Sequence, residues 1–301
     1  MSQAPDELIA WLGGAPDGAT RQTTEGANRG ADALGGKGAS LDKLGRLGFR
    51  VPPGFCLTTA AFRSQQQSAV DEALAGAVSQ LVAEVGAAGF EPRFAVRSSA
   101  VGEDGSAASY AGLHETELDV PPSEIAGAVR RCWASLWSPA AIAYRARRAL
   151  SADDAAMAVV VQALVPAVAS AVVFTRHPVT GRDDQLVITA VRGLGDAMVS
   201  GTVTPDTYVI DRASRGVVQF EPGEDPRGRA LGPDVLAALV ELCLAIEGKF
   251  GLAVDVEAAF AGEHWYLLQA RPITTGAPAP SSPSPSSPSP SSPASSSDAR
   301  T

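Results

Sequence analysis

The sequence predicts an α+β protein with two lobes and a disordered tail, and three observations support this fold class. Apolar residues recur at helical spacing in several segments, while short β-branched runs between them are typical of strands. Hydrophobic residues make up 45% of the 301 residues, as is ordinary for a protein with a packed core. A Ser/Pro-rich stretch near the C-terminus contains no large apolar residue and is typical of disorder.

The first half of the chain predicts a leader followed by short helices and strands. Residues 1–30, rich in Gly, Ala, Thr and Asp, predict a flexible leader. Leu41, Leu44 and Leu47 have helical spacing, and Gly48 can end that helix. The other elements expected here are an extended piece after a turn, an amphipathic helix, a short strand and a polar loop, over residues 51–55, 71–85, 94–97 and 98–112.

The second half predicts two helices, then several strands, a long helix and a hairpin. Ser123 and Ser138 each start a helix, the second with Pro139 at its first helical position. Strands are expected over 158–165, 170–175, 185–191 and 207–211, a helix over 233–250, and a hairpin over 253–261 and 264–271. The predicted organisation is a leader over 1–30, a first lobe over 31–120, a second lobe over 121–275 and a tail over 276–301.

Charge and composition exclude several classes of protein. The chain has 33 acidic and 24 basic residues and a formal charge of -9, which argues against a protein that binds nucleic acid through bulk charge. Three widely spaced cysteines form no Cys-x-x-Cys pair and predict buried thiols in a reducing compartment. Without a basic N-terminal region or an apolar run of about 18 residues, we expect a cytoplasmic protein with no membrane segment.

Lys37 lies in a glycine cluster, GGKGASL over residues 35–41, that opens the first predicted helix. Glycines let backbone N–H groups approach phosphate oxygens, the helix N-terminus favours negative charge, and the lysine adds a point charge. The spacing differs from the Walker pattern. A plain turn before a helix is the alternative interpretation.

Arg97 closes a predicted strand and precedes a loop rich in hydroxyl groups and glycine. The planar guanidinium offers a fork of donors to phosphate oxygens, and serine hydroxyls and backbone N–H groups can fill the gaps. An exposed arginine beside a polar surface loop is the alternative.

The predicted hairpin places two carboxylates beside an amide and a guanidinium. Residues two apart in a strand share a face, so Asp255 lies with Glu257 and Gln269 lies with Arg271. A register in which paired residue numbers sum to 526 sets Glu257 opposite Gln269 and Asp255 opposite Arg271, whereas a sum of 525 misaligns them, and we favour the former. Oxygen ligands of this kind suit Mg2+ together with substrate phosphates. The alternative is an ordinary ion pair on a solvated sheet face.

Two glycine-punctuated loops, over residues 174–181 and 193–206, follow buried strands. They are expected either to line a cleft or to serve as simple connections. His177 is the histidine best placed for chemistry, although a His-Pro step is commonly only a turn.

Taken together, these clusters make the sequence similar to the nucleotide-binding domain of the phosphoenolpyruvate synthase, pyruvate phosphate dikinase and rifampicin phosphotransferase family. The matching segments run in family order over about residues 30–275: GGKGASL (35–41), VPPGF (51–55), VRSSA (96–100) with ED (103–104), AG (111–112) with Thr116, FT (174–175) with Pro178, Thr180 and Gly181, VTPD (203–206), DVE (255–257) and LQARPIT (268–274). The resemblance implies an ATP-grasp fold, in which two α+β lobes clamp ATP.

The resemblance also implies a role for individual residues, with ATP and Mg2+ as cofactors. The implied phosphate contacts are Lys37 and Arg97, the loop over the triphosphate includes Gly112 and Thr116, the adenine-region contact is Gln162, the Mg2+ ligands are Glu257 and Gln269, and Arg271 lies near the transferred phosphate. Lys37, Arg97 and Arg271 are the expected catalytic residues. Phosphoryl transfer depends mainly on positioning and charge neutralisation, which these side chains and a metal supply.

The sequence departs from the family pattern at two positions near these motifs. Asp196 follows Gly193-Leu194-Gly195 where the family usually has glutamate, and Ala258 follows Glu257 where an aromatic residue is usual. Neither departure removes an expected ligand.

The function expected from the resemblance is an ATP- and Mg2+-dependent phosphotransferase module, related to kinases and dikinases. The family's phosphoryl acceptor is a histidine on a swivelling domain that we do not expect in this chain. The acceptor is therefore expected on a separate phosphohistidine-domain protein or on a small molecule. The alternative is a non-catalytic nucleotide-sensing or regulatory protein. Such a protein would not need to retain all of the charged and polar site residues, which are Lys37, Arg97, Glu257, Gln269 and Arg271. The sequence does not distinguish phosphoenolpyruvate, pyruvate or antibiotic chemistry.

Overall fold

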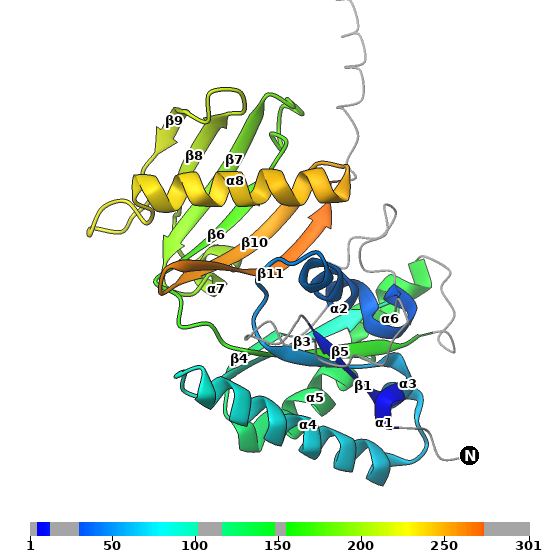
Figure 1. Ribbon diagram of the computed structural model, residues 1–301. Coiled ribbons are helices and arrows are strands. Elements are labelled where there is room, and N and C mark those ends of the chain that lie inside the picture. The colour runs from blue at the N-terminus through cyan, green and yellow to red at the C-terminus, as the bar shows by residue number, and fades with distance from the viewer. Residues whose placement is uncertain (1–4, 13–29, 102–115, 148–154, 274–301) are drawn as a thin grey trace, which may run out of the picture.

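Two antiparallel sheets, with helices packed around and between them, form the protein (Figure 1). The computed structural model describes residues 5–12, 30–101, 116–147 and 155–273. The first sheet has five strands in the order β1-β2-β5-β3-β4, and the second has six in the order β11-β10-β6-β7-β8-β9. The mixed helix-and-sheet class predicted from the sequence is therefore confirmed.

The first sheet is covered on both faces. Its strands are β1 (Ile9–Leu12), β2 (Gly54–Leu57), β3 (Phe94–Ala100), β4 (Thr116–Val120) and β5 (Met157–Ala163), and its main helices are α2 (Ala31–Arg46), α4 (Gln67–Ala87) and α5 (Ile125–Ser135). Alternate residues of β5 face opposite sides. Val159 and Val161 join the core that includes α4 and α5, while Val160 joins Leu34 and Leu41 of α2 on the other face.

The second sheet packs one face against a single long helix. Its strands are β6 (Ala169–Phe174), β7 (Gln185–Arg192), β8 (Asp206–Asp211), β9 (Val217–Glu221), β10 (Val254–Ala261) and β11 (His264–Pro272), and the helix is α8 (Pro233–Phe250). Leu239 and Ile246 of α8 lie in one core with Val173 and Ile188. The helix ends at Phe250 and is capped by Gly251, whose φ of 70° suits glycine. The helix predicted over 233–250 is confirmed.

Short helices complete the described chain. They are α1 (Pro5–Leu8), α3 (Thr59–Arg63), a 3-10 turn (Pro122–Glu124), α6 (Pro139–Arg147) and α7 (Asp196–Val199). Ser138 accepts a hydrogen bond from the backbone N–H of Ala141 at 3.2 Å, as expected for an N-cap. Within the described ranges, no helix combines the length and apolar character that a membrane crossing requires.

Part of the predicted leader is ordered. Ile9–Leu12 form β1, which pairs with β2 so that Trp11 lies opposite Phe55. The rings of these two residues meet edge to face at 5.5 Å between centroids. The sequence did not predict this strand, because the short apolar run lies in a leader whose overall composition is rich in Gly and Thr. Residues 13–29 and the predicted tail lie outside the described residues.

The two sheets do not divide at residue 120 as expected. Strand β5 belongs to the segment expected in the second lobe, yet it is the central strand of the first sheet, between β2 and β3. Strand β3 also runs to Ala100, beyond the predicted end at Arg97, because it pairs with β5 as far as Met157. These differences arise from pairings between distant segments, which local pattern does not report.

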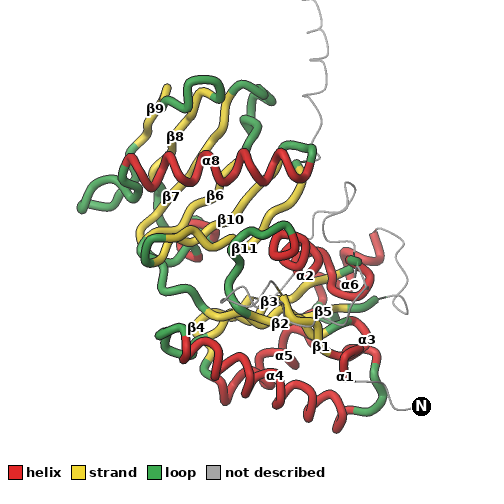
Figure 2. The backbone as a smooth tube through the Cα atoms, viewed as in Figure 1, coloured by secondary structure: helices red, strands yellow, loops and turns green. Residues whose placement is uncertain are grey.

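Helix α2 lies between the two sheets (Figure 2). Its Leu34 and Leu41 pack against the first sheet, whereas Leu44 belongs to the core of the second. The hydroxyl of Ser40 donates a hydrogen bond to the carbonyl oxygen of Ala270 in β11. The helix is interrupted at Gly35, where φ is 66° and ψ is 178°.

We expect Gly35→Ala to destabilise the fold by about 2 kcal/mol or more, because this backbone conformation is almost confined to glycine. A Cβ there would also lie 2.0 Å from the carbonyl oxygen of Ser99. Urea unfolding measures the change. The matched control is Gly76→Ala in α4, where a Cβ meets nothing within 4 Å and helix propensity should add about 0.5–1 kcal/mol. Equal unfolding midpoints for the two variants would contradict this account of the break.

Candidate functional site

A cavity of about 480 Å³ lies between the two sheets. Its wall combines α2, β3, β4, β5, β6, α7, β10 and β11 with the short connection from β5 to β6. The volume falls within the range of small-molecule and cofactor sites. The site is therefore built where the two sheets face each other, from segments far apart in the sequence.

Seven of the eight residues predicted to bind the nucleotide and metal line this one cavity. They are Lys37, Arg97, Thr116, Gln162, Glu257, Gln269 and Arg271. The eighth, Gly112, lies outside the described residues. The structure therefore brings together side chains that the sequence separates by more than two hundred positions.

Lys37 reaches the cavity because of the interruption in α2. The backbone leaves the helical path at Gly35 and returns to it at the next residue. Lys37 is half-buried, whereas the adjacent glycines Gly36 and Gly38 are buried. The lysine thus lies in the first turn after the break, beside backbone N–H groups at the start of a helical segment.

Arg97 links the first sheet to the hairpin of the second. Its Nη1 donates a hydrogen bond to the carbonyl oxygen of Leu268 at 3.0 Å, and its Nη2 lies 3.6 Å from Oε2 of Glu257. Its Nε is buried and has no hydrogen-bond partner among the described residues. An unpaired buried donor costs free energy. This N–H group is therefore able to donate a hydrogen bond to a ligand in the cavity.

The hairpin has the register predicted from the sequence. Asp255 lies opposite Arg271 and Glu257 lies opposite Gln269, and a β-bulge follows directly after Glu257. Nε of Arg271 donates to Oδ2 of Asp255 at 2.8 Å. Bulges redirect neighbouring side chains and often occur next to functional sites. Here the bulge lies at the carboxylate that lines the cavity.

Asp255 is buried behind Arg271, and only 8% of its surface is exposed. Its Oδ1 is buried and has no hydrogen-bond partner within the described part of the chain. Burial raises the pKa of this carboxyl above its ordinary value, the charge and hydrogen bond of Arg271 lower it, and the charge of Glu257 raises it. The resulting pKa is raised because burial outweighs the arginine.

Glu257 and Gln269 could hold a divalent cation through oxygen atoms. They face each other across the β10–β11 ladder, and both line the cavity. Over the described ranges, no group of three or more His, Cys, Asp or Glu residues could hold a metal. A site with one carboxylate and one amide suits Mg2+, which usually keeps water or substrate phosphate as its other ligands.

Another part of the cavity wall is more apolar. Gln162 is only 2% exposed, and its Nε2 donates to the carbonyl oxygen of Pro52 at 3.3 Å. Leu164 and Val165 continue the wall on the connection to the second sheet. This connection packs against Ala259 and Ala261 of the hairpin, so the cavity has an apolar part there and a charged part at Arg97, Glu257 and Arg271.

Three other residues singled out in the sequence have structural roles. The Ser99 hydroxyl, expected to help bind phosphate, is fully buried and bonded to α2. Nδ1 of His177 accepts from the backbone N–H groups of Val179 and Thr180 within a turn, both at 3.3 Å. Asp206 accepts from the backbone N–H of Gly223 at 2.7 Å and of Ala230 at 2.6 Å. None of the three lines the cavity.

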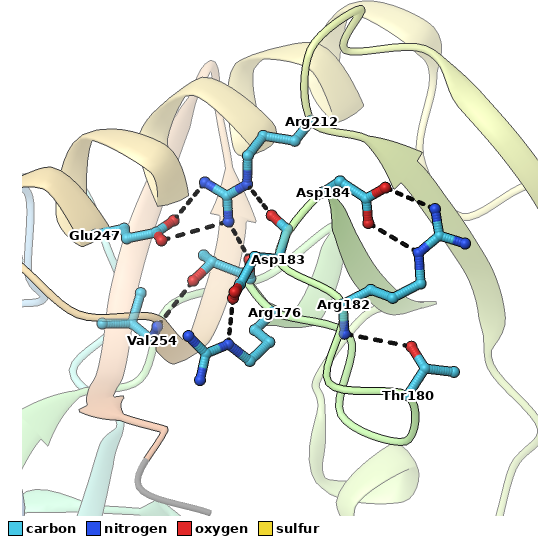
Figure 3. A network of polar contacts seen from close by, with 9 residues as sticks. Arg176, Thr180, Arg182, Asp183, Asp184, Arg212, Glu247 and Val254 are labelled. Carbon is cyan, nitrogen blue, oxygen red and sulfur yellow. Dashed lines mark hydrogen bonds and ion pairs between the residues drawn. The ribbon is translucent and has the colours of Figure 1, made fainter. Parts of the chain in front are cut away.

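A second, more open hollow of about 980 Å³ lies at the end of the second sheet where β11 finishes. Most of its charged residues are paired, as Figure 3 shows: Arg212 with Glu247 at 2.9 Å and Arg176 with Asp183 within the wall, and Asp184 of the wall with Arg182 outside it at 2.6 Å. These pairings leave its charge largely neutralised. The cavity between the sheets is therefore the better candidate for a charged ligand.

The motifs did not identify the whole cavity wall. Ser170, Asp196 and Met198 line it, yet of these three only Asp196 stands out in the sequence, as a departure from the family pattern. Ser170 comes from β6, two positions before Val172 on the same strand face. Strand alternation could have suggested this position once the neighbouring lining residues were known.

Comparison with known proteins gives one family match. The sequence model of the pyruvate phosphate dikinase AMP/ATP-binding domain matches residues 64–230, more than half of the chain. That range includes Arg97, Thr116 and Gln162 but neither Lys37 nor the β10–β11 hairpin.

Individual relatives match a longer part of the chain. A probable phosphoenolpyruvate synthase from Archaeoglobus fulgidus is 35% identical, over 80% of this chain and 40% of that protein. A rifampicin phosphotransferase from Streptomyces sviceus is 34% identical, over 83% of this chain and 35% of that protein. The chain thus spans two fifths or less of the length of these relatives. A solved D-alanine–D-alanine ligase from Helicobacter pylori is 11% identical with a TM-score of 0.30, over 78% of this chain and 60% of that one; this similarity supports no inference.

We expect Asp255→Asn to raise stability, and by more at pH 7 than at pH 4. Folding raises the pKa of Asp255, so its carboxyl contributes fully to the free energy of unfolding only below its unfolded pKa. That contribution is lost as pH rises through the folded pKa. The amide oxygen of asparagine can still accept from Nε of Arg271. Urea unfolding at the two pH values measures the difference.

Asp211→Asn is the control of opposite sign. The hydroxyl and backbone N–H of Ser214 both donate to Asp211 and lower its pKa. Its contribution to stability is present at pH 7 and is lost as pH falls. Asp211→Asn should therefore lower stability, and by more at pH 7. A parallel pH response of the two variants would contradict the assignment for Asp255.

Proposed function

Because the chain belongs to the pyruvate phosphate dikinase AMP/ATP-binding domain family, we propose that it binds ATP with Mg2+ between its two sheets and transfers a phosphoryl group from it. The observation that carries this proposal is the convergence of Lys37, Arg97, Glu257, Gln269 and Arg271 on one cavity. A triphosphate and its metal require such a mixture of cations and oxygen ligands.

The proposed arrangement is that of an ATP-grasp protein. The base occupies the apolar part of the cavity, near Gln162 and Leu164, and the triphosphate extends toward the hairpin. This orientation is supported by the distribution of charge, since the cationic side chains lie toward α2, β3 and β11. Thr116 at the start of β4 lies directly opposite Arg97 in the ladder, where its hydroxyl can reach the same phosphates.

Each charged residue has a proposed role in phosphoryl transfer. Lys37 and Arg97 hold phosphate oxygens, and Arg271, oriented by Asp255 at 2.8 Å, neutralises charge at the transferred group. Glu257 and Gln269 would hold Mg2+, which when bound would neutralise phosphate charge. Catalysis by these side chains is electrostatic and positional, with no covalent intermediate on this domain.

Arg97 and Glu257 also stabilise each other's charge in the site before a ligand binds. The two charges lie 3.6 Å apart and are partly buried, with 13% and 28% of their side-chain surfaces exposed. Each therefore moderates the cost of burying the other. When the ligand binds, phosphate oxygens can replace Glu257 as the partner of Arg97, and a cation can replace Arg97 as the partner of Glu257. Neither charge is then left unpaired.

The proposed acceptor is a histidine on a separate protein, or a small molecule. In the family resemblance, the β-phosphoryl group of ATP passes to histidine and AMP leaves, while water cleaves the bond between the β- and γ-phosphates and releases phosphate. A cytoplasmic location fits the three cysteines, Cys56, Cys132 and Cys243, which are buried and form no disulfide within the described part of the chain.

Isothermal titration should detect binding of Mg-ATP, and Glu257→Gln should weaken it by about tenfold or more, or about 1.4 kcal/mol. Omission of Mg2+ should weaken the wild type but have little further effect on the variant. The matched control is Glu247→Gln, since Glu247 is also a partly buried glutamate paired with an arginine, but in the second hollow. Absence of binding by the wild type, or equal losses in both variants, would contradict the proposed site.

Arg271→Met should lower phosphoryl transfer by about a hundredfold or more, because a donor aimed at developing charge is removed. The reaction contains ATP and, as acceptor, a histidine-bearing domain from a relative added as a separate protein. The AMP formed is quantified by ion-exchange chromatography. Mg-ATP binding by the variant, measured separately, should persist. Failure of the wild type to form AMP under any acceptor condition tested would count against transfer while leaving the binding proposal standing.

A further inference from the structure

Ser99 occupies an unusual place in the hydrogen bonding of α2. Its hydroxyl donates to the carbonyl oxygen of Leu34 at 2.7 Å and accepts from the backbone N–H of Gly38 at 3.0 Å. In an unbroken helix, the N–H of Gly38 would donate directly to that carbonyl, four residues earlier. The serine hydroxyl thus stands between the two groups and satisfies both.

The break in α2 depends on this insertion. A side chain that enters the i→i−4 ladder is one of the established causes of a helix interruption. At Gly35 the backbone comes so close to β3 that an added Cβ would lie 2.4 Å from Oγ of Ser99. Ser99 itself is fully buried, with 0% of its surface exposed. The hydroxyl therefore bridges the two ends of the 34–38 turn and fixes the turn against β3.

Lys37 lies inside the turn that Ser99 closes. The two bonded groups, on Leu34 and Gly38, flank it in the sequence. Arg97 is two residues before Ser99 on the same strand, so the two side chains share one face of the first sheet. A single strand thus presents Arg97 to the cavity directly and holds the backbone around Lys37 through Ser99.

We propose that Ser99 is a positioning residue for the phosphate-binding lysine. It acts by setting the backbone of the 34–38 turn, so that the Lys37 ammonium meets the same phosphates as the Arg97 guanidinium. The inference rests on the proposed function, because it assigns Ser99 a role only through the binding of a phosphate ligand. Ser99 makes no contact with the ligand itself.

The test is a double-mutant cycle on Mg-ATP affinity, measured by isothermal titration with the full chain. Ser99→Ala should raise the Kd about tenfold in the wild-type background and less than about twofold in a Lys37→Met background. Loss of stability alone would leave the two steps equal. Ser99→Cys, whose thiol keeps weak donor and acceptor capacity, should give an intermediate Kd and carries the same cycle if the alanine variant does not fold.

Thr59→Val supplies the matched control. The Thr59 hydroxyl is also buried, at 4% exposure, and donates to the carbonyl oxygen of Asp32 at 2.8 Å, on the same helix before the break. This variant should lower the urea midpoint to a similar degree as Ser99→Ala while leaving the Kd within about twofold of wild type.

Three results would overturn the inference. They are an unchanged Kd in Ser99→Ala, an equal rise of the Kd in Thr59→Val, and a Ser99→Ala effect of the same size with and without Lys37. If the unsubstituted chain binds no Mg-ATP, the proposed function itself fails and this inference fails with it. If the unsubstituted chain binds and Lys37→Met weakens binding, any of the three results counts against Ser99 alone.

Discussion

The contact of α2 with both sheets is the constraint on which the site depends. Leu34 and Leu41 join one core and Leu44 joins another, so a single helix fixes the distance between two walls of the cavity. The Ser40 hydrogen bond to Ala270 adds a polar connection to β11. Apolar burial on two sides of a helix is worth several kcal/mol in total, and it holds the lysine turn opposite the carboxylate hairpin.

The charges at the cavity follow from this packing. Arg97, Glu257, Asp255 and Arg271 form a row in which the two carboxylates lie between the two cations, with ion-pair distances of 3.6 Å and 2.8 Å at the two ends. Burying such a row without ligand is costly, and unpaired atoms on Arg97 and Asp255 among the described residues reflect that cost. Sites that must receive a highly charged ligand commonly retain unsatisfied groups of this kind.

The parts of the fold that the sequence predicted well are those with local signals. The β10–β11 hairpin follows from two alternating runs joined at Gly262, and its register placed Glu257 opposite Gln269 as observed. The grouping of the seven site residues was implied by the family resemblance, and the structure places all seven on one cavity. The bulge after Glu257, the joining of β1 to β2, and the insertion of Ser99 into the ladder of α2 depend on contacts between distant segments. No periodicity in the chain reports such contacts, so these features required coordinates.

The strand order of the first sheet also restricts how the chain can acquire its structure. Strand β5 separates β2 from β3, so before residues 157–163 arrive the earlier strands can form only two isolated ribbons, β1 with β2 and β3 with β4. Two-stranded ribbons are marginally stable in water. During synthesis, the first sheet therefore cannot form until a strand more than fifty residues downstream of β3 has left the ribosome. A fragment that ends before that strand would expose the apolar surfaces of α4 and α5.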